Sequence, residues 1–188
     1  LARAPPDAAG LPAWQAAALG RALALALGPE LKAVAPQAVA GLEGALQAAA
    51  AAGGALSDVA SLAWSLAVVH GGLPDHVLPA LARALGRASA SDLDAPARAL
   101  LLDAALLHAA HTGRQGASQP GGPRPSRSAL EAAVAKLGAS RDVRDALLSA
   151  YIETVPYDAS LTGGALFVVA HAVLAAPHLN ALQGGKGG

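Results

Sequence analysis

The sequence lacks cysteine, which excludes disulfide bonds and thiolate metal ligands. Methionine is also absent, and aromatic residues make up only 3% of the 188 residues. The formal net charge is zero, which argues against a strongly basic nucleic-acid binder. No uninterrupted apolar run has the length of a membrane span, so we expect no membrane segment. Because the first residue is Leu1 and not methionine, we expect a processed or partial chain.

Sequence motifs of catalysis are missing as well. There is no phosphate-binding loop, no dinucleotide-binding glycine pattern and no nucleophile-elbow motif. His108 and His111 are spaced to ligate a metal from one helix face, but no third ligand is indicated, and histidines at a helix end are the more ordinary interpretation. We therefore predict no catalytic residue, no metal site, no cofactor and no small-molecule substrate. Trp14 and Trp64 are expected to be core anchors.

What the sequence does contain is alanine and leucine, both strong helix formers, within a 54% hydrophobic composition. Apolar spacing and turn residues predict a series of short amphipathic helices. The expected helices cover 11–27, 29–52 with a break near Pro36, 57–70 capped by Ser57, 74–85 opened by Pro74, 96–111 capped by Ser91 or Asp94, 128–138 with Ser128 and Glu131 as a capping box, and 141–150.

The C-terminal part follows a different pattern. Residues 151–155 are rich in strand formers with partial alternation, and residues 165–170 form a short apolar run. Two such runs separated by Pro, Asp and Gly are typical of β-strands. The second run also fits a buried helix, since periodicity does not decide at that length.

Positive charge gathers in one segment. Residues 112–126 have no apolar periodicity and are expected to form a flexible linker. The wider stretch 112–145 carries six basic and three acidic side chains, a net charge of +3. A solvated linker is the plainer interpretation, and RNA contact through phosphate is the functional one. The candidate RNA-binding residues are Arg114, Arg124, Arg127, Arg141 and Arg144.

Two of the expected helices repeat one pattern. The segments 58–70 and 96–108 align with an offset of 38 residues, which places Trp64 on Leu102 and His70 on His108. A period of this size indicates a helix-pair repeat. The segment from Asp58 to Leu85, with its Leu-Ala-Trp-Ser-Leu-Ala core, a glycine turn and Pro-Asp before the second helix, resembles the octotricopeptide repeat of green-algal organellar proteins and the related helical region of the FASTK-type family.

Residues 128–188 resemble the beginning of a RAP domain, which often follows such repeats. The resemblance rests on a helix ending at Gly138, on Val155-Pro-Tyr-Asp-Ala-Ser-Leu161, on Phe167-Val-Val-Ala-His-Ala-Val173 and on Ala176-Pro-His178. RAP domains resemble restriction endonucleases, whose metal site needs two carboxylates and a lysine. Here Asp158 stands alone, and His171 occupies the place of the second acid. We therefore expect no nuclease activity.

The resemblance implies a mainly α fold, a helical-repeat (α-solenoid) array followed by a small α/β RAP-like, endonuclease-like segment. The expected organisation is a repeat domain at 1–111, a linker at 112–127 and a partial RAP-like segment at 128–188. The implied function is non-catalytic work in an organellar RNA system, as a structural subunit of, or factor associated with, a mitochondrial or chloroplast ribosome that contacts or stabilises RNA. The mitochondrion is favoured. The partners would be rRNA or mRNA and protein subunits, without a membrane. The alternative is a pure protein–protein scaffold of an organellar complex without RNA contact.

Overall fold

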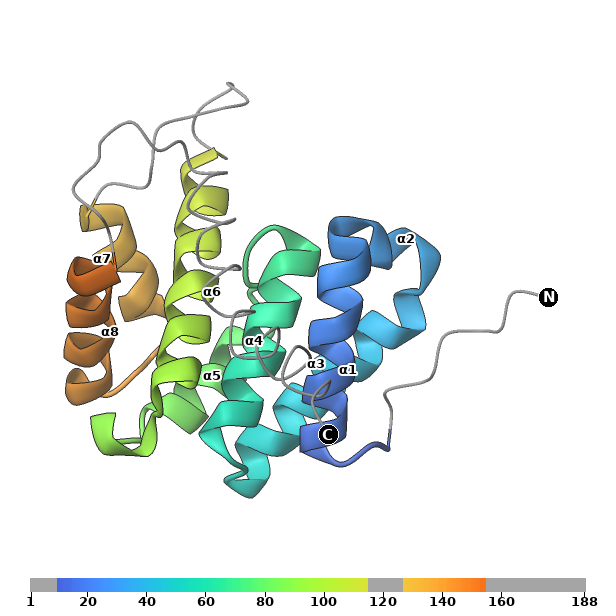
Figure 1. Ribbon diagram of the computed structural model, residues 1–188, viewed down its shortest axis with the longest axis horizontal. Coiled ribbons are helices and arrows are strands. Elements are labelled where there is room, and N and C mark those ends of the chain that lie inside the picture. Colours follow the sequence, from blue (N-terminus) through green and yellow to red (C-terminus); the bar gives the residue numbers. More distant parts are fainter. Residues whose placement is uncertain (1–9, 115–126, 155–188) are drawn as a thin grey trace, which may run out of the picture.

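The computed structural model describes residues 10–114 and 127–154, and within these ranges the protein is mainly α-helical, with no β-strand. Figure 1 shows the helices standing side by side. In chain order the helical elements are α1 Ala13–Leu27, η1 Gly28–Glu30, α2 Leu31–Val34, α3 Pro36–Ala52, α4 Leu56–His70, α5 Leu78–Leu85, η2 Ala90–Asp92, α6 Ala95–Arg114, α7 Arg127–Lys136 and α8 Arg141–Thr154.

Proline and glycine set several helix boundaries. The expected break near Pro36 is confirmed, because Ala35 leaves the helical conformation at φ −148° and ψ 63° and a proline disfavours helix in the residue before it. Helix α3 ends at Gly53 and α4 at Gly71, both with positive φ, a conformation that glycine adopts without a side-chain clash.

The predicted caps had mixed outcomes. Ser57 does not cap α4, which begins one residue earlier with Ala55 at the N-cap. Pro74 does not open a helix, because residues 74–77 form a turn and α5 begins at Leu78. Burial of Leu73 and Val77 fixes that turn against the core. Asp94 does cap α6, since its Oδ1 accepts a hydrogen bond from the Ala97 amide at 2.8 Å.

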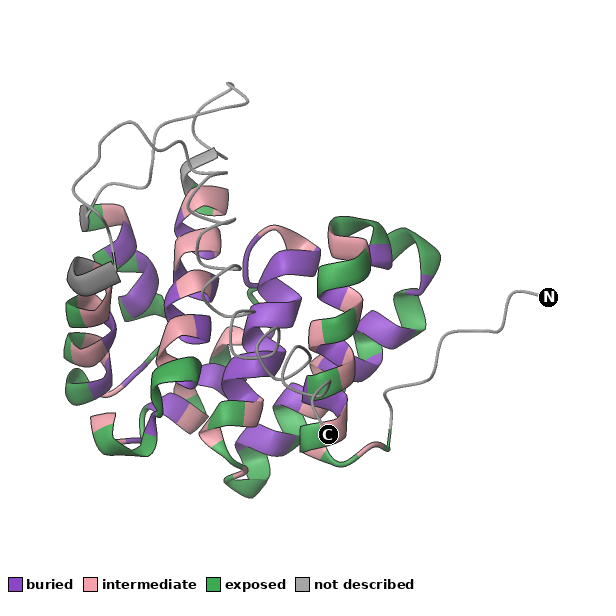
Figure 2. Ribbon diagram, in the orientation of Figure 1, coloured by how far each residue is buried: buried purple, intermediate pink, exposed green. Residues whose placement is uncertain are grey.

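The helices pack in a row with further helices behind it. Helix α4 lies between α1 and α6, and α3 and α5 pack behind this row (Figure 1). Helices α7 and α8 pack against α6 at the other end. As a result every residue from 59 to 69 in α4 is buried (Figure 2). The core is dominated by alanine and leucine, and these small side chains let neighbouring helices approach closely.

The two tryptophans differ. Trp64 is the core anchor that the sequence predicted, since it is fully buried and its Nε1 donates a hydrogen bond to Asp103 Oδ2 at 2.6 Å, across the α4–α6 contact. Trp14 is 62% exposed, so its prediction as a core anchor is wrong. The physical reason is its position on the outer side of α1, where none of the described helices packs.

The expected strand at 151–155 is also wrong over its described residues. Residues 151–154 continue α8 as a helix. Val143 and Leu147 are fully buried and Tyr151 packs on the same core, so a helical spacing of four residues governs this segment. The second expected strand, 165–170, lies outside the described residues.

The expected linker is partly described. Helix α6 runs through Arg114, three residues beyond the expected end at His111, and α7 begins at Arg127, one residue before the expected cap Ser128. Residues 115–126 lie outside the described ranges. The expected domain boundary at 111 therefore lies inside α6, and the one at 127 lies at the first residue of α7.

Candidate functional site

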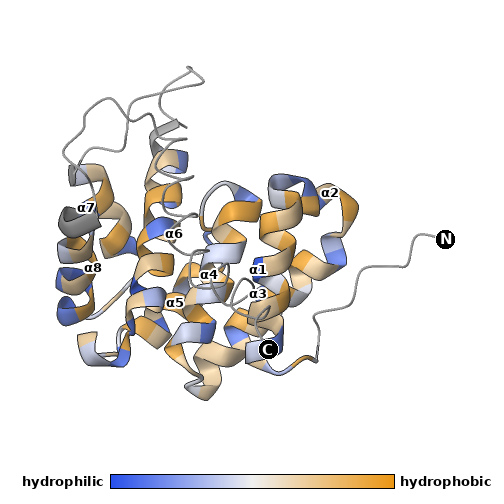
Figure 3. Cartoon of the chain, in the orientation of Figure 1, coloured by the Kyte–Doolittle hydropathy of each residue, from blue (hydrophilic) through white to orange (hydrophobic). Residues whose placement is uncertain are grey.

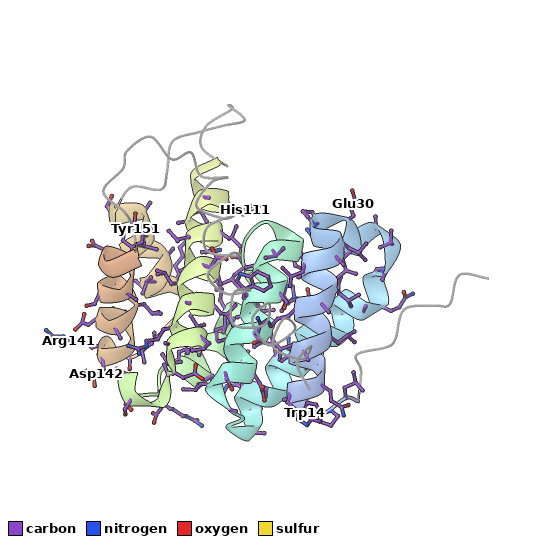
Figure 4. The ribbon with its side chains drawn as sticks, in the orientation of Figure 1. Trp14, Glu30, His111, Arg141, Asp142 and Tyr151 are labelled. Carbon is purple, nitrogen blue, oxygen red and sulfur yellow. The ribbon has the colours of Figure 1, made fainter. Side chains whose placement is uncertain are left out.

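The five predicted RNA-binding arginines are described unequally. The backbones of Arg114 and Arg127 belong to α6 and α7, but their side chains, and all of Arg124, lie outside what the structure describes. Arg141 and Arg144 lie in the first turns of α8. The Arg141 side chain is 87% exposed at the outer edge of the molecule (Figure 4). Two of the five are thus placed at one site, and the grouping of the other three stays a prediction.

The two placed arginines have different surroundings. Arg141 Nε lies 3.8 Å from Asp145 Oδ2, an exposed pair of a kind that contributes little stability. Arg144 is half-buried, and its Nε is shielded from solvent without a hydrogen-bond partner. Arg141 is therefore the more accessible of the two for an anionic ligand.

Ser140 joins the start of α8 to the end of α5. Its amide donates a hydrogen bond to the Leu85 carbonyl at 3.1 Å, and its hydroxyl donates one to the Ala88 carbonyl at 2.8 Å. Gly138, at φ 66°, lies so close that an added Cβ would be 2.8 Å from the Ala82 Cα. These contacts fix two segments together that are more than fifty residues apart in the chain. We call this contact the α5–α8 junction.

Two further arginines lie on the α5 side of the junction. Arg83 and Arg87 are exposed and lie directly beside the residues that contact Gly138 and Ser140. Sequence reasoning missed both, because they lie far from the positive segment and only tertiary packing places them there. The same region carries four acidic side chains, so its formal charge is balanced. These are Asp92, Asp94, Asp142 and Asp145.

Two of these acids already serve the backbone. Asp92 Oδ2 accepts hydrogen bonds from the Ser89 amide and hydroxyl, both at 2.8 Å, and the backbone bond is the main reason that the pKa of Asp92 is lowered. Asp94 caps α6. Asp142 lies in the first turn of α8, where the helix dipole favours an acid. Asp92, Asp94 and Asp142 thus stabilise helix starts, while Arg83, Arg87 and Arg141 are exposed.

A second polar cluster surrounds the turn between α4 and α5. Glu43 of α3 lies between two histidines, with its Oε1 3.2 Å from His70 Nε2 and its Oε2 3.0 Å from His76 Nε2. The contact with His70 lacks the geometry of a hydrogen bond, so it is an electrostatic pair. Burial lowers the pKa of His70, Lys32 lowers it further, and Glu43 opposes both.

His108 lies on the other side of this turn. It is buried near the Leu73 backbone, and within the described ranges neither ring nitrogen has a hydrogen-bond partner of good geometry. Burial lowers the pKa of His108, and Lys136 lowers it further, while Asp75 raises it. His111 packs against the turn so closely that an added Cβ on Gly72 would be 2.6 Å from the His111 Cβ. The cluster therefore holds the turn in place.

The described residues contain no group of three histidine or acidic side chains arranged to hold a metal ion. None of the helices described is both long enough and apolar enough to cross a membrane. The α5–α8 junction, with its exposed arginines, is therefore the candidate site at which this surface would meet an anionic partner.

Comparisons with known proteins give no relative. No family model matches the chain, and neither the curated proteins nor the solved structures include a significant match.

Proposed function

We propose that this chain is a non-catalytic helical-repeat protein of an organellar RNA system, acting as a structural subunit of, or factor associated with, a mitochondrial or chloroplast ribosome. The α5–α8 junction is the observation that supports the RNA-contact part of this proposal. Its α5 side carries the exposed Arg83 and Arg87, and its α8 side carries the predicted pair Arg141 and Arg144. The guanidinium fork of arginine donates two hydrogen bonds to one phosphate, so such a group suits an RNA backbone.

The helical-repeat part of the proposal is supported by the packing of α4 and α6. These are the two helices that share the repeated pattern, and they lie side by side. Trp64 and Leu102, which align in the repeat, are both buried. That the array is an α-solenoid built from such pairs stays our proposal. The RAP-like nature of 128–188 also stays a proposal, and the structure describes this segment only over residues 128–154.

The charge at the junction limits the RNA affinity that we propose. The segments that meet at the junction carry four arginines and four aspartates, so long-range attraction to RNA is weak. Contacts to phosphate position a protein and carry no sequence information. We therefore expect weak, salt-sensitive and sequence-indifferent binding, which gains specificity from a larger assembly.

Two matched triple variants test where RNA is bound. The first replaces the junction residues Arg83, Arg87 and Arg141 with alanine, and the second replaces Arg114, Arg124 and Arg127. Each lost phosphate contact should flatten the slope of log affinity against log salt by about 0.7, or roughly two units for three arginines. Fluorescence anisotropy with a labelled single-stranded RNA at several salt concentrations measures this slope. If neither triple variant changes it, RNA contact through these arginines is refuted.

The alternative is a protein–protein scaffold without RNA contact. The observation that favours it is the balanced charge of the junction together with an exposed apolar side of α1, which carries Trp14 and Leu25. Whether a purified native particle that contains this chain also contains RNA decides between the two functions.

A further inference from the structure

The outer face of α1 is apolar and exposed. Trp14 is 62% exposed and Leu25 57% exposed, and the small residues Ala18 and Ala22 lie between them, also exposed. Positions 14, 18, 22 and 25 fall on one side of a helix. On α2, Val34 is also 61% exposed. In Figure 4 the Trp14 side chain extends from the first turn of α1 at the edge of the molecule.

The opposite face of α1 shows how this helix binds a neighbour. At Gly20 an added Cβ would lie 2.9 Å from Leu42 Cδ2 and 3.2 Å from Ser65 Oγ, so α4 and α3 approach the α1 backbone closely there. Residue 20 lies about half a turn away from 18 and 22, given 3.6 residues per turn. The exposed stripe therefore points along the row of helices, away from α4.

The two ends of the row differ in what they expose. Helix α4, inside the row, is buried by helices on both sides. At the far end, α8 exposes polar side chains on its outer side (Figure 3), namely Arg141, Asp142, Asp145 and Ser149. A polar outer face is what the terminal unit of a stacked helical array needs for solubility. Among the described residues, the outer side of α1 presents Trp14, Ala18, Ala22 and Leu25 in place of such a polar face.

One charge borders the apolar stripe and indicates the chemistry of what covers it. Arg21 lies one helical turn from Ala18 and from Leu25, at the edge of the stripe, and is half-buried, and among the described residues it has no carboxylate partner. Covering the stripe would remove solvent from this guanidinium, which is costly unless an acid pairs with it. The complementary surface is therefore apolar with one carboxylate.

We infer that the outer face of α1 docks an amphipathic helix of a partner protein, whose apolar face carries an Asp or Glu that pairs with Arg21. Ala18 and Ala22 have smaller side chains than Trp14 and Leu25 on either side of them, which leaves room for a ridge of side chains from such a helix. The partner helix would pack on the side of α1 that points away from α4, and so extend the row by one helix. This inference rests on the helical-repeat part of the proposed function and is independent of RNA contact.

A second copy of this chain fits the stripe less well. An antiparallel pair centred between Ala18 and Ala22 would place Arg21 of each copy within about one helical turn of the other, with no acid nearby. The charge pattern therefore favours a partner that supplies the acid.

The test uses two synthetic helical peptides with the same leucine and alanine apolar face. One carries Glu in the middle of that face and the other Lys. Binding to the full chain is followed by the change in Trp14 fluorescence. We expect the Glu peptide to bind about fivefold more tightly, and Arg21→Glu to reverse this preference. Leu25→Glu should abolish the binding of both peptides, whereas Ser149→Glu on the exposed side of α8 is the matched control and should leave it unchanged.

Two measurements on the same proteins test the other possible occupants of the stripe, which are a second copy of the chain and a lipid surface. Sedimentation should show a monomer whose mass does not rise with concentration, and vesicles of phosphatidylcholine with phosphatidylserine should not bind. The inference is overturned if neither peptide binds, if both bind the Leu25→Glu chain as they bind the original, or if Arg21→Glu leaves the preference unchanged. Self-association or vesicle binding that Leu25→Glu removes would also overturn it, in favour of a second copy or a lipid surface. RNA affinity should be the same in all these variants, so a failure here leaves the RNA proposal standing.

Discussion

The two ends of the helical row present unlike surfaces. The outer side of α8 is lined by charged and hydroxyl side chains, among them Arg141 and Asp145, while the outer side of α1 is lined by Trp14, Ala18 and Leu25. Both helices bury one face against the row in the same way. Because both helices lie at an end of the row, the difference comes from their residues: α8 has polar side chains on its outer side, whereas α1 has apolar ones of the kind that α4 buries inside the row.

Helix α4 shows the opposite extreme. It has helices on both sides and behind it, so even Ser61 and Ser65 are buried. The Ser65 hydroxyl is satisfied locally by donating to the Ser61 carbonyl at 2.7 Å. Stability is therefore concentrated at α4 and should decrease toward α1 and α8.

The largest expected effect separates the centre of the row from its end. Leu66→Asp places an unpaired carboxylate in the fully buried α4 seam, and we expect a loss above about 4 kcal/mol or failure to fold. The same change at Leu25, on the exposed side of α1, should alter stability by no more than about 0.5 kcal/mol. Urea denaturation compares the two variants. Equal effects would show that the Leu25 side of α1 is as buried as α4. Leu81→Asp, at a fully buried position of α5, should repeat the Leu66 result.

A glycine pair tests how firmly the α8 end is attached. Gly138→Ala puts a side chain into left-handed backbone and against the Ala82 Cα, so we expect a loss of about 2–4 kcal/mol. The control is Gly44→Ala, where an added Cβ on helix α3 meets nothing within 4 Å. That change should be neutral or stabilise by up to about 1 kcal/mol, through helix propensity. A harmless Gly138→Ala would mean that the α5–α8 junction is loose.

The smallest expected effect concerns pH. The pKa values of His70 and His108 are lowered from their ordinary value of 6.5, chiefly by burial, so the unfolded chain takes up these protons first. Their contribution to stability is present above pH 6.5 and is lost as the pH falls below it. Melting temperatures of the original chain and of His108→Gln across this range measure the effect. The variant should lose stability less steeply on acidification, and an identical slope would exclude His108 as a cause.

The sequence predicted the helices better than their surroundings. Helical spacing located most elements, and the break near Pro36 and the Asp94 cap are confirmed, since proline and cap chemistry act locally. The strand at 151–155 failed because the strand-forming residues there follow a helical spacing set by Val143 and Leu147. The position of Trp14 was predicted wrongly because exposure depends on which neighbour lies beyond α1.

The candidate site was only partly predictable for the same reason. Arg141 and Arg144 were found because they lie within a positive segment of the sequence. Arg83 and Arg87 join them only through the Ser140 hydrogen bonds to the end of α5, and no local pattern reports such a contact. Glu43 and His76 likewise meet across 33 positions of the chain.

The most direct test of the difference between the two ends is a measurement of how accessible Trp14 is to solvent. The chain has two tryptophans, one exposed in α1 and one buried in α4. We predict that acrylamide quenches a large part of the fluorescence of the original chain, and that Trp14→Phe removes this part and leaves blue-shifted, protected emission from Trp64, with unchanged stability. If the original chain is already fully protected and Trp14→Phe destabilises it, the α1 face is covered within the chain, and the open end on which this account depends does not exist.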